Sequence, residues 1–184
     1  MSQLTKIDTF SIDSRQRSGK QTITVAVERV AAAPPERLID RIWSGTEWNL
    51  GRPGVKGLAI EYDDGKHQSV HICADWRGQN LTMSVMRFRE GAGLITFFYS
   101  RLPPGVSRQS GIWEAYAHQE GCRVRFTRSL QLQRGKAEDA GAFHAREEAF
   151  GDIIKQSMAL SLDDIMREAL VHLKYKSLKS LTFT

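Results

Sequence analysis

The chain has 184 residues, of which 41% are hydrophobic and 26% are charged, and its formal net charge is +5. This length and composition indicate one soluble domain with a sizeable core. The positive charge permits nucleic-acid binding, but no helix-turn-helix, zinc finger or aromatic-studded RNA-binding strand accompanies it, so no nucleic-acid partner is expected. The longest uncharged run, Gly91–Ser100, is about half the length that a membrane-spanning helix needs, and no membrane insertion is expected.

Cofactor and targeting signals are missing from the sequence pattern. There is no phosphate-binding glycine loop and no dinucleotide fingerprint, and His67 and His71 lie ~13 Å apart along one strand face, so we expect neither a cofactor nor a metal. Cys73 and Cys122 have no paired spacing, which is consistent with a reducing compartment. Because residues 1–8 do not resemble a signal peptide, a cytoplasmic location is expected.

The first third of the chain predicts one strand and two short helices. Residues 1–20 are polar and are expected to form a flexible arm ahead of a single domain over residues 21–175. Thr22–Val30 alternates apolar and polar residues and predicts a strand. Pro35 suits the first turn of a helix that ends near Gly45, and Thr46 is placed to begin a second short helix containing Trp48.

Strand patterns separated by turn residues fill the middle of the chain. The turns contain glycine, as in Asp63-Asp64-Gly65, or the proline pair Pro103-Pro104. The strands are expected at Leu58–Tyr62, His67–Trp76, Leu81–Arg89, Leu94–Arg101, Ser110–Gln119 and Cys122–Arg134.

A long amphipathic helix is predicted over Ala142–Lys174, followed by a basic tail over residues 176–184. The apolar stripe consists of Phe150, Ile154, Met158, Leu162, Ile165, Ala169 and Leu173. The solvated flank is expected to carry Glu147, Lys155, Asp163 and Arg167. A helix this long exceeds what the domain needs, so we expect a bend or break near Gly151.

Ser157 and Ser161 lie on or beside this stripe, one turn apart. Either they donate hydrogen bonds back to helix carbonyls, or the helix faces a partly polar cavity. Because the apolar stripe must be buried against a strand-rich partner, the fold class is α+β: a curved antiparallel sheet of about seven strands wrapped around the C-terminal helix.

Two arginines fall on the apolar faces of their strands. In Cys122–Arg134 the alternation is regular, and Arg128 continues the face of Val124 and Phe126. In Leu81–Arg89, Arg87 continues the face of Leu81, Met83 and Val85. Each arginine either forms a buried ion pair, reaches solvent at a strand end, or lines a cavity.

Trp113, between Gly111 and Ala115, is either a packed core residue or a cavity wall. Small neighbours on its strand face leave room for a ligand.

These features resemble the START-like helix-grip superfamily, and most closely the polyketide aromatase/cyclases. The resemblance covers roughly Thr22 to Leu170. The strings that carry it are Thr22–Trp48, the alternating Leu81, Met83, Val85 and Arg87, the run Ser110–Trp113, the strand Gly121–Leu132 and the pair Gln156-Ser157. The chain departs from those relatives at Leu81 and Met83, where they often carry tryptophans, and at Leu160, where some carry an acid.

The resemblance implies a helix-grip fold with Arg87 lining the pocket as a catalytic residue. Arg128 falls where relatives carry a polar cavity residue, and it is the second catalytic candidate. The substrate-binding candidates are Leu81, Met83, Val85, Trp113, Phe126, Ser157 and Ser161.

Two functions fit this sequence. The first is a polyketide aromatase/cyclase that closes a poly-β-ketone delivered by an acidic acyl carrier protein, as a monomer or homodimer. The second is a non-catalytic protein that binds a hydrophobic small molecule. Both require an internal cavity of several hundred Å³, the usual scale of small-molecule sites.

Overall fold

The computed structural model describes residues 22–45, 55–76 and 78–180. They form a seven-stranded antiparallel sheet with the strand order β1-β7-β6-β5-β4-β3-β2, one short helix and one long helix. The strands are β1 (Ile23–Ala31), β2 (Val55–Asp63), β3 (His67–Trp76), β4 (Gln79–Glu90), β5 (Leu94–Arg101), β6 (Val106–His118) and β7 (Gly121–Leu132). The helices are α1 (Pro35–Ser44) and α3 (Ala140–Ser180). The predicted α+β helix-grip fold is confirmed, while the second short helix expected around Trp48 lies outside the described residues.

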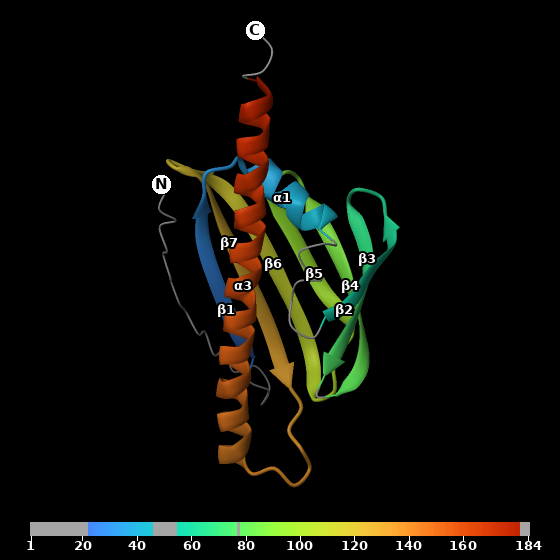
Figure 1. The fold of residues 1–184 in the computed structure, drawn as a ribbon. Helices are drawn as coiled ribbons and strands as arrows, with labels where there is room; N and C mark the ends of the chain where they lie inside the picture. The colour runs from blue at the N-terminus through green and yellow to red at the C-terminus, as the bar shows by residue number, and fades with distance from the viewer. Residues whose placement is uncertain (1–21, 46–54, 77, 181–184) are drawn as a thin grey trace.

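The long helix lies along one face of the sheet (Figure 1). It packs against β1, β7 and α1, and α1 in turn packs against β5, β6 and β7. Strands β2 to β4 curve away beside the helix, so that half of the sheet is not covered by α3. No helix among the described residues is long and apolar enough to cross a membrane.

The register of β7 follows the predicted alternation. Val124, Phe126, Leu130 and Leu132 are buried, and Arg128 is buried with them at 8% exposure. β7 pairs with β1 on one side and with β6 on the other, so its hydrogen bonds fix the register from both edges. The prediction that Arg128 points inward is confirmed.

The predicted bend at Gly151 is wrong, because α3 runs through this residue without interruption. Gly151 is buried, and a Cβ atom placed on it would lie 3.5 Å from Ile23 Cγ2 on β1. The missing side chain therefore brings the helix close to the sheet. The predicted stripe is buried on either side of this contact, at Ile154 and Met158 among others.

Glu147 does not lie on a solvated flank, as the sequence pattern suggested. It precedes Gly151 by one turn on the buried stripe and is only 3% exposed. Its Oε1 atom has no hydrogen-bond partner among the described residues, and Nδ1 of the His144 ring lies 3.8 Å from Oε2. Burial raises the pKa of this carboxyl group.

A partly buried ion pair joins the helix to the edge of the sheet, with the Asp163 side chain 44% exposed. Arg29 on β1 is 3% exposed, and its Nε donates to Asp163 Oδ1 on α3 at 2.9 Å. Arg29 Nη1 also donates to the Glu28 carbonyl at 2.9 Å. The pair therefore ties α3 to β1 at this point of the sheet.

The raised pKa of Glu147 predicts a pH-dependent cost to stability. The unfolded chain ionises this group at a lower pH than the folded protein does, so stability falls as the pH rises through the two pKa values. Glu147→Gln should therefore raise the free energy of unfolding at about pH 7 and have a smaller effect at about pH 4. Urea titrations at both pH values measure the difference.

Glu148→Gln is the matched control, because the Glu148 side chain is 70% exposed on the next residue of the same helix. Equal effects of Glu147→Gln at the two pH values would contradict the assignment of a buried, destabilising carboxylate.

Candidate functional site

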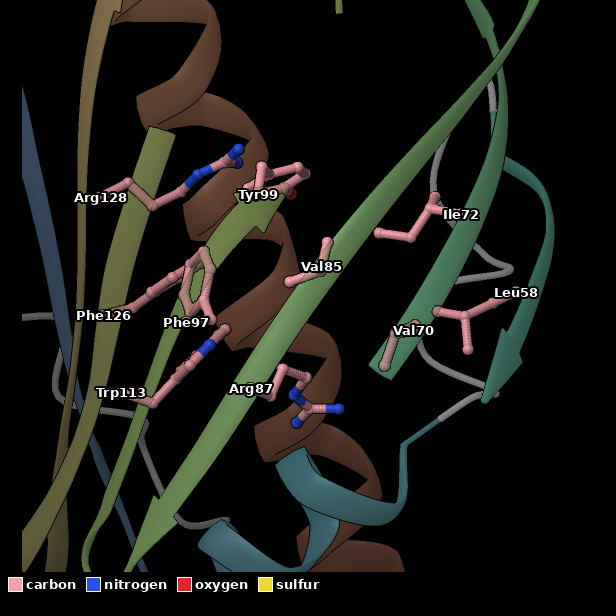
Figure 2. Close-up of a pocket in the computed structure, with 10 residues that line it drawn as sticks. All are labelled: Leu58, Val70, Ile72, Val85, Arg87, Phe97, Tyr99, Trp113, Phe126 and Arg128. Atoms are coloured by element: carbon pink, nitrogen blue, oxygen red, sulfur yellow. The ribbon is translucent and has the colours of Figure 1, made fainter. Parts of the chain in front are cut away.

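A cavity lies on the inner face of the sheet, beside the part covered by α3 (Figure 2). It is lined by Leu58, Val70, Ile72, Val85, Arg87, Phe97, Tyr99, Trp113, Phe126 and Arg128. Its volume of about 70 Å³ is far below the several hundred expected from the sequence. The lining includes four large rings from β5, β6 and β7, and these bulky side chains take up room on the inner face of the sheet.

The cavity has an aliphatic wall and an aromatic wall. Leu58, Val70, Ile72 and Val85 come from β2, β3 and β4, and the rings come from β5, β6 and β7. Trp113 and Phe126 stack with ring centroids 3.5 Å apart and an interplanar angle of 12°. The site therefore offers flat apolar surfaces suited to a planar ligand.

Gly111 makes the aromatic wall possible. A Cβ atom at this position would overlap both the Phe97 ring and the Thr127 carbonyl oxygen. The missing side chain lets the Phe97 ring lie across β6, where its centroid is 6.1 Å from that of Phe126. The small residue noted beside Trp113 thus makes room for a neighbouring ring of the protein.

The two inward arginines lie in one cross-strand row. Arg87 pairs with Phe97, Phe97 with Gly111, and Gly111 with Arg128. Three strand spacings separate the arginine Cα atoms, or about 14 Å. Their side chains diverge, because Arg87 points towards α1 and Arg128 towards Tyr99 (Figure 2).

The guanidinium of Arg87 is held by the C-terminal turn of α1. Its Nη1 donates to the Trp43 carbonyl at 3.2 Å and to Gln68 Oε1 at 2.6 Å, and its Nη2 donates to the Ile42 carbonyl. It also lies over the Trp43 ring, 5.2 Å from the centroid. These carbonyls have no partner within the helix, and the cation matches the negative end of the helix dipole. Arg87 therefore lines the cavity with its charge already bound by the protein.

Asp63 completes this network from the far end of β2. Gln68 Nε2 donates to Asp63 Oδ2 at 2.8 Å, and the Trp43 indole donates to Asp63 Oδ1 at 3.2 Å. Desolvation raises the pKa of Asp63, but hydrogen bonds from Gly65, Gln68 and Trp43 and the charge of Arg87 bring it below its ordinary value. Burial lowers the pKa of Arg87 to about 10, which leaves the guanidinium charged at neutral pH. The network is thus a carboxylate–guanidinium pair bridged by an amide.

Arg128 is the unsatisfied cation of the site. Its Nε is buried without a hydrogen-bond partner, and no carboxylate among the described residues pairs with it. Its guanidinium carbon lies 5.9 Å from the centre of the Tyr99 ring, and the Tyr99 ring lines the same cavity. A buried guanidinium with so little compensation is costly, and an oxygen atom of a ligand in the cavity would satisfy it.

The structure brings together five of the nine residues proposed from the sequence. Val85, Arg87, Trp113, Phe126 and Arg128 all line the cavity. The other proposed residues, which are not among the described lining residues, are Leu81, Met83, Ser157 and Ser161. Ser161 Oγ instead donates to the Ser157 carbonyl at 2.6 Å, as in the first of the two interpretations offered for these serines.

Sequence reasoning missed Leu58, Val70, Ile72, Phe97 and Tyr99 as lining residues. Their signal is the two-residue spacing of Val70 and Ile72 on β3, and of Phe97 and Tyr99 on β5. That spacing identifies a face but not which face points inward.

The cavity lining contains few kinds of polar group. No carboxylate or imidazole is among the described lining residues, and no group of three or more metal-binding side chains occurs in the part of the chain that the structure describes. The polar groups in the lining are the two guanidiniums, the Tyr99 hydroxyl and the Trp113 indole N–H. The site can therefore bind and polarise oxygen atoms, but it has no strong base of its own.

Comparison with known proteins reveals the fold but no close relative. No family model and no curated protein matches the sequence. Among solved structures, the di-domain aromatase/cyclase StfQ from the steffimycin biosynthetic pathway superposes with a TM-score of 0.72 at 12% identity, over 83% of this chain and 52% of that one. This chain therefore spans about half the length of StfQ.

Two other similar structures match over nearly their whole length. The Zhui aromatase/cyclase from Streptomyces sp. R1128 gives a TM-score of 0.64 at 18% identity, over 84% of this chain and 96% of that one. A STAR-related lipid transfer protein from Xanthomonas axonopodis gives 0.58 at 12%, over 88% and 99%. The likeness is one of fold, and it bears out the resemblance to the START-like helix-grip proteins.

The role of Arg87 as a support for α1 predicts a large loss of stability on its removal. Arg87→Ala would leave the Ile42 carbonyl and Gln68 Oε1 without this donor, at about 1–3 kcal/mol for each buried group left unsatisfied, while the Trp43 carbonyl would keep only its 3.3 Å bond from Gln68 Nε2. The melting temperature should fall by several degrees, as measured by circular dichroism.

Arg89→Ala is the matched control, because Arg89 lies two residues further on the same face of β4. It pairs at 2.6 Å with Asp40, whose side chain is 63% exposed, and such pairs contribute about 0–1 kcal/mol. If the two variants melted at the same temperature, Arg87 would not be a structural support.

Proposed function

We propose that this protein is a polyketide aromatase/cyclase that folds a poly-β-ketone in the helix-grip cavity and closes it by intramolecular aldol condensation. The observation that carries the proposal is Arg128, a buried cation without a carboxylate partner among the described residues, aimed into a cavity with an aromatic wall. The similarity in fold to two aromatase/cyclases supports it.

The aldol step calls for the chemistry that this cavity offers. A proton leaves a carbon between two carbonyl groups, the resulting enolate attacks a second carbonyl carbon, and the new alkoxide takes up a proton. Negative charge therefore moves between oxygen atoms, and a fixed guanidinium in a water-poor site stabilises it wherever it develops. The flat rings of Trp113 and Phe126 hold the chain in one folded pose, which removes most of the entropic cost of ring closure.

Proton transfer is assigned to water and to the Tyr99 hydroxyl, since the described lining holds no carboxylate or imidazole. The hydrogens between adjacent carbonyl groups are acidic, so a weak base suffices once the enolate is stabilised. Loss of the aldol hydroxyl as water then gives the aromatic ring. In this assignment Arg128 is the catalytic cation, while Arg87 is a positioning residue that fixes α1 at one end of the cavity.

The substrate is larger than the cavity, so binding must widen it. Leu58 and Ile72 are only partly buried, in contrast to the Phe97, Trp113 and Phe126 rings of the opposite wall. Their side of the cavity is the one that can move with the smallest loss of packing. We place the entrance there, and propose that an acidic acyl carrier protein delivers the chain to this cationic protein in the cytoplasm.

A second candidate is a binding or transfer protein for a hydrophobic small molecule with an acidic oxygen. The absence of a carboxylate or imidazole from the described lining favours it, because binding needs Arg128 but no base. The shared fold with a STAR-related lipid transfer protein is in line with this candidate.

Reconstitution with a minimal polyketide synthase tests the proposal. Addition of the wild-type protein should redirect the products towards one regiospecific aromatic compound. Arg128→Met should reduce this product about 100- to 1,000-fold, the usual loss when one oxyanion-stabilising donor is removed. Arg128→Lys should restore it in part, since an ammonium lacks the planar fork of a guanidinium.

Arg125→Met is the control, because Arg125 is an exposed cation on the outer face of the same strand. An unchanged product profile with wild-type protein, together with Arg128-dependent binding of an aromatic carboxylic acid, would replace the cyclase with the binding protein. No change in products and no such binding would overturn both candidates.

A further inference from the structure

The outer face of the sheet carries a second cluster of reactive side chains, on the opposite side of the sheet from the cavity. Ser84 Oγ on β4 lies 3.1 Å from His71 Nδ1 on β3. The other ring nitrogen, Nε2, lies 2.7 Å from Glu61 Oε2 on β2. A nucleophile within hydrogen-bond reach of a base, which is itself oriented by a third group, is the arrangement that activates a serine.

Two irregularities in the sheet position this cluster. His71 and Ser84 face each other directly across the β3–β4 ladder. In the β2–β3 ladder the register shifts between Ile60 and Tyr62, so Glu61 is the extra residue of a bulge. A second shift in the β4–β5 ladder pairs Ser84 with Arg101 and Val85 with Tyr99. β-bulges re-aim side chains and are over-represented beside active sites.

The hydrogen bonds place the protons for general-base catalysis. The ionised Glu61 carboxylate only accepts hydrogen bonds, so the short contact at 2.7 Å requires a proton on His71 Nε2. In the neutral ring Nδ1 is then a free acceptor, and the Ser84 hydroxyl donates to it. His71 is thus held in the tautomer that can take the Ser84 proton.

Acyl transfer also needs a group that stabilises the oxyanion and a surface that binds the acyl chain, and both lie near Ser84. Arg101 is exposed and lies directly opposite Ser84 in the ladder, so its side chain is on the same face, where it can approach a developing oxyanion. Further along this face, a shallow hollow of about 480 Å³ is lined by Phe88, Phe98 and Ile112 among others. Phe98 pairs with Met86, two residues beyond Ser84, so the hollow begins beside the cluster and offers an apolar surface.

We propose that Ser84, His71 and Glu61 form a second reaction centre that hydrolyses small esters or thioesters with an apolar acyl group. Ser84 Oγ bonds to the acyl carbon as its proton passes to His71 Nδ1. The bond to the leaving alcohol or thiol then breaks, and that group takes the proton from His71. Water releases the acyl group in the same way, with His71 again accepting and returning one proton, so no redox partner is needed.

Labelling with an alkyl fluorophosphonate, followed by peptide mass spectrometry, tests this proposal. The wild-type protein should be labelled on Ser84 and should hydrolyse 4-nitrophenyl butyrate. Ser84→Ala should abolish the labelling of that peptide. His71→Gln should lower the labelling rate about 100-fold or more, the usual contribution of a positioned general base, and Glu61→Gln should give a smaller decrease.

Ser69→Ala is the matched control, because Ser69 lies on the same face of β3, two residues from His71, and should leave labelling unchanged. The fold of each variant is checked by its circular dichroism spectrum. Absence of label on Ser84 in the wild-type protein would overturn the proposal. Labelling of a folded His71→Gln variant at the wild-type rate would overturn it equally.

Discussion

A buried guanidinium must have its charge and its donors satisfied, and this requirement organises the interior of the protein. Arg29, Arg87 and Arg128 all point towards the side of the sheet that the helices cover, and the first two are satisfied by the protein. Arg29 pairs with Asp163 and thereby holds α3, while Arg87 binds the end of α1. Only Arg128 has no such partner among the described residues. Arg29 and Arg87 thus hold the helices in place, while Arg128 leaves a positive charge facing the cavity.

The position of the cavity follows from these two attachments. α3 lies along β1 and β7, whereas α1 is fastened to β4 and β3 through Arg87 and Gln68. Between these attachments lie β5 and β6, which α1 contacts and α3 does not cover. Large rings fill part of the remaining volume, so the cavity is small when empty. In the proposed function a ligand packs on these rings, and the cavity widens on the partly buried side of Leu58 and Ile72.

Local periodicity predicted most of the fold, because each strand shows which residues share a face. It placed Arg128 inward correctly, since the alternation in β7 is regular over the whole strand. It failed where distant segments decide the outcome. The carbonyls that bind Arg87 lie 44 and 45 residues away in the sequence, so no local pattern could reveal them.

Burial of α3 was misjudged for the same reason. Glu147 and Gly151 have sequence properties of an exposed residue and a weak point, yet Gly151 packs against β1 and Glu147, one turn earlier, is also buried. The cluster at Ser84 was missed for a different reason. Its bulges shift the register by one residue at Glu61 and again at Ser100, and a strict two-residue period cannot predict where such a shift occurs.

The lone charge of Arg128 also couples ligand binding to the stability of the fold. In the ligand-free protein its burial opposes folding, because the unfolded chain keeps the guanidinium hydrated. A ligand that brings an anionic oxygen into the cavity removes this cost and binds only the folded state, so it stabilises the protein by more than its apolar contacts alone would do. Neutral ligands of the same shape gain the stacking on Trp113 and Phe126 but leave the charge unsatisfied. Under the proposed function the ligand is therefore acidic as well as flat, which fits an enolate passing through a reaction as well as a stable phenolate or carboxylate.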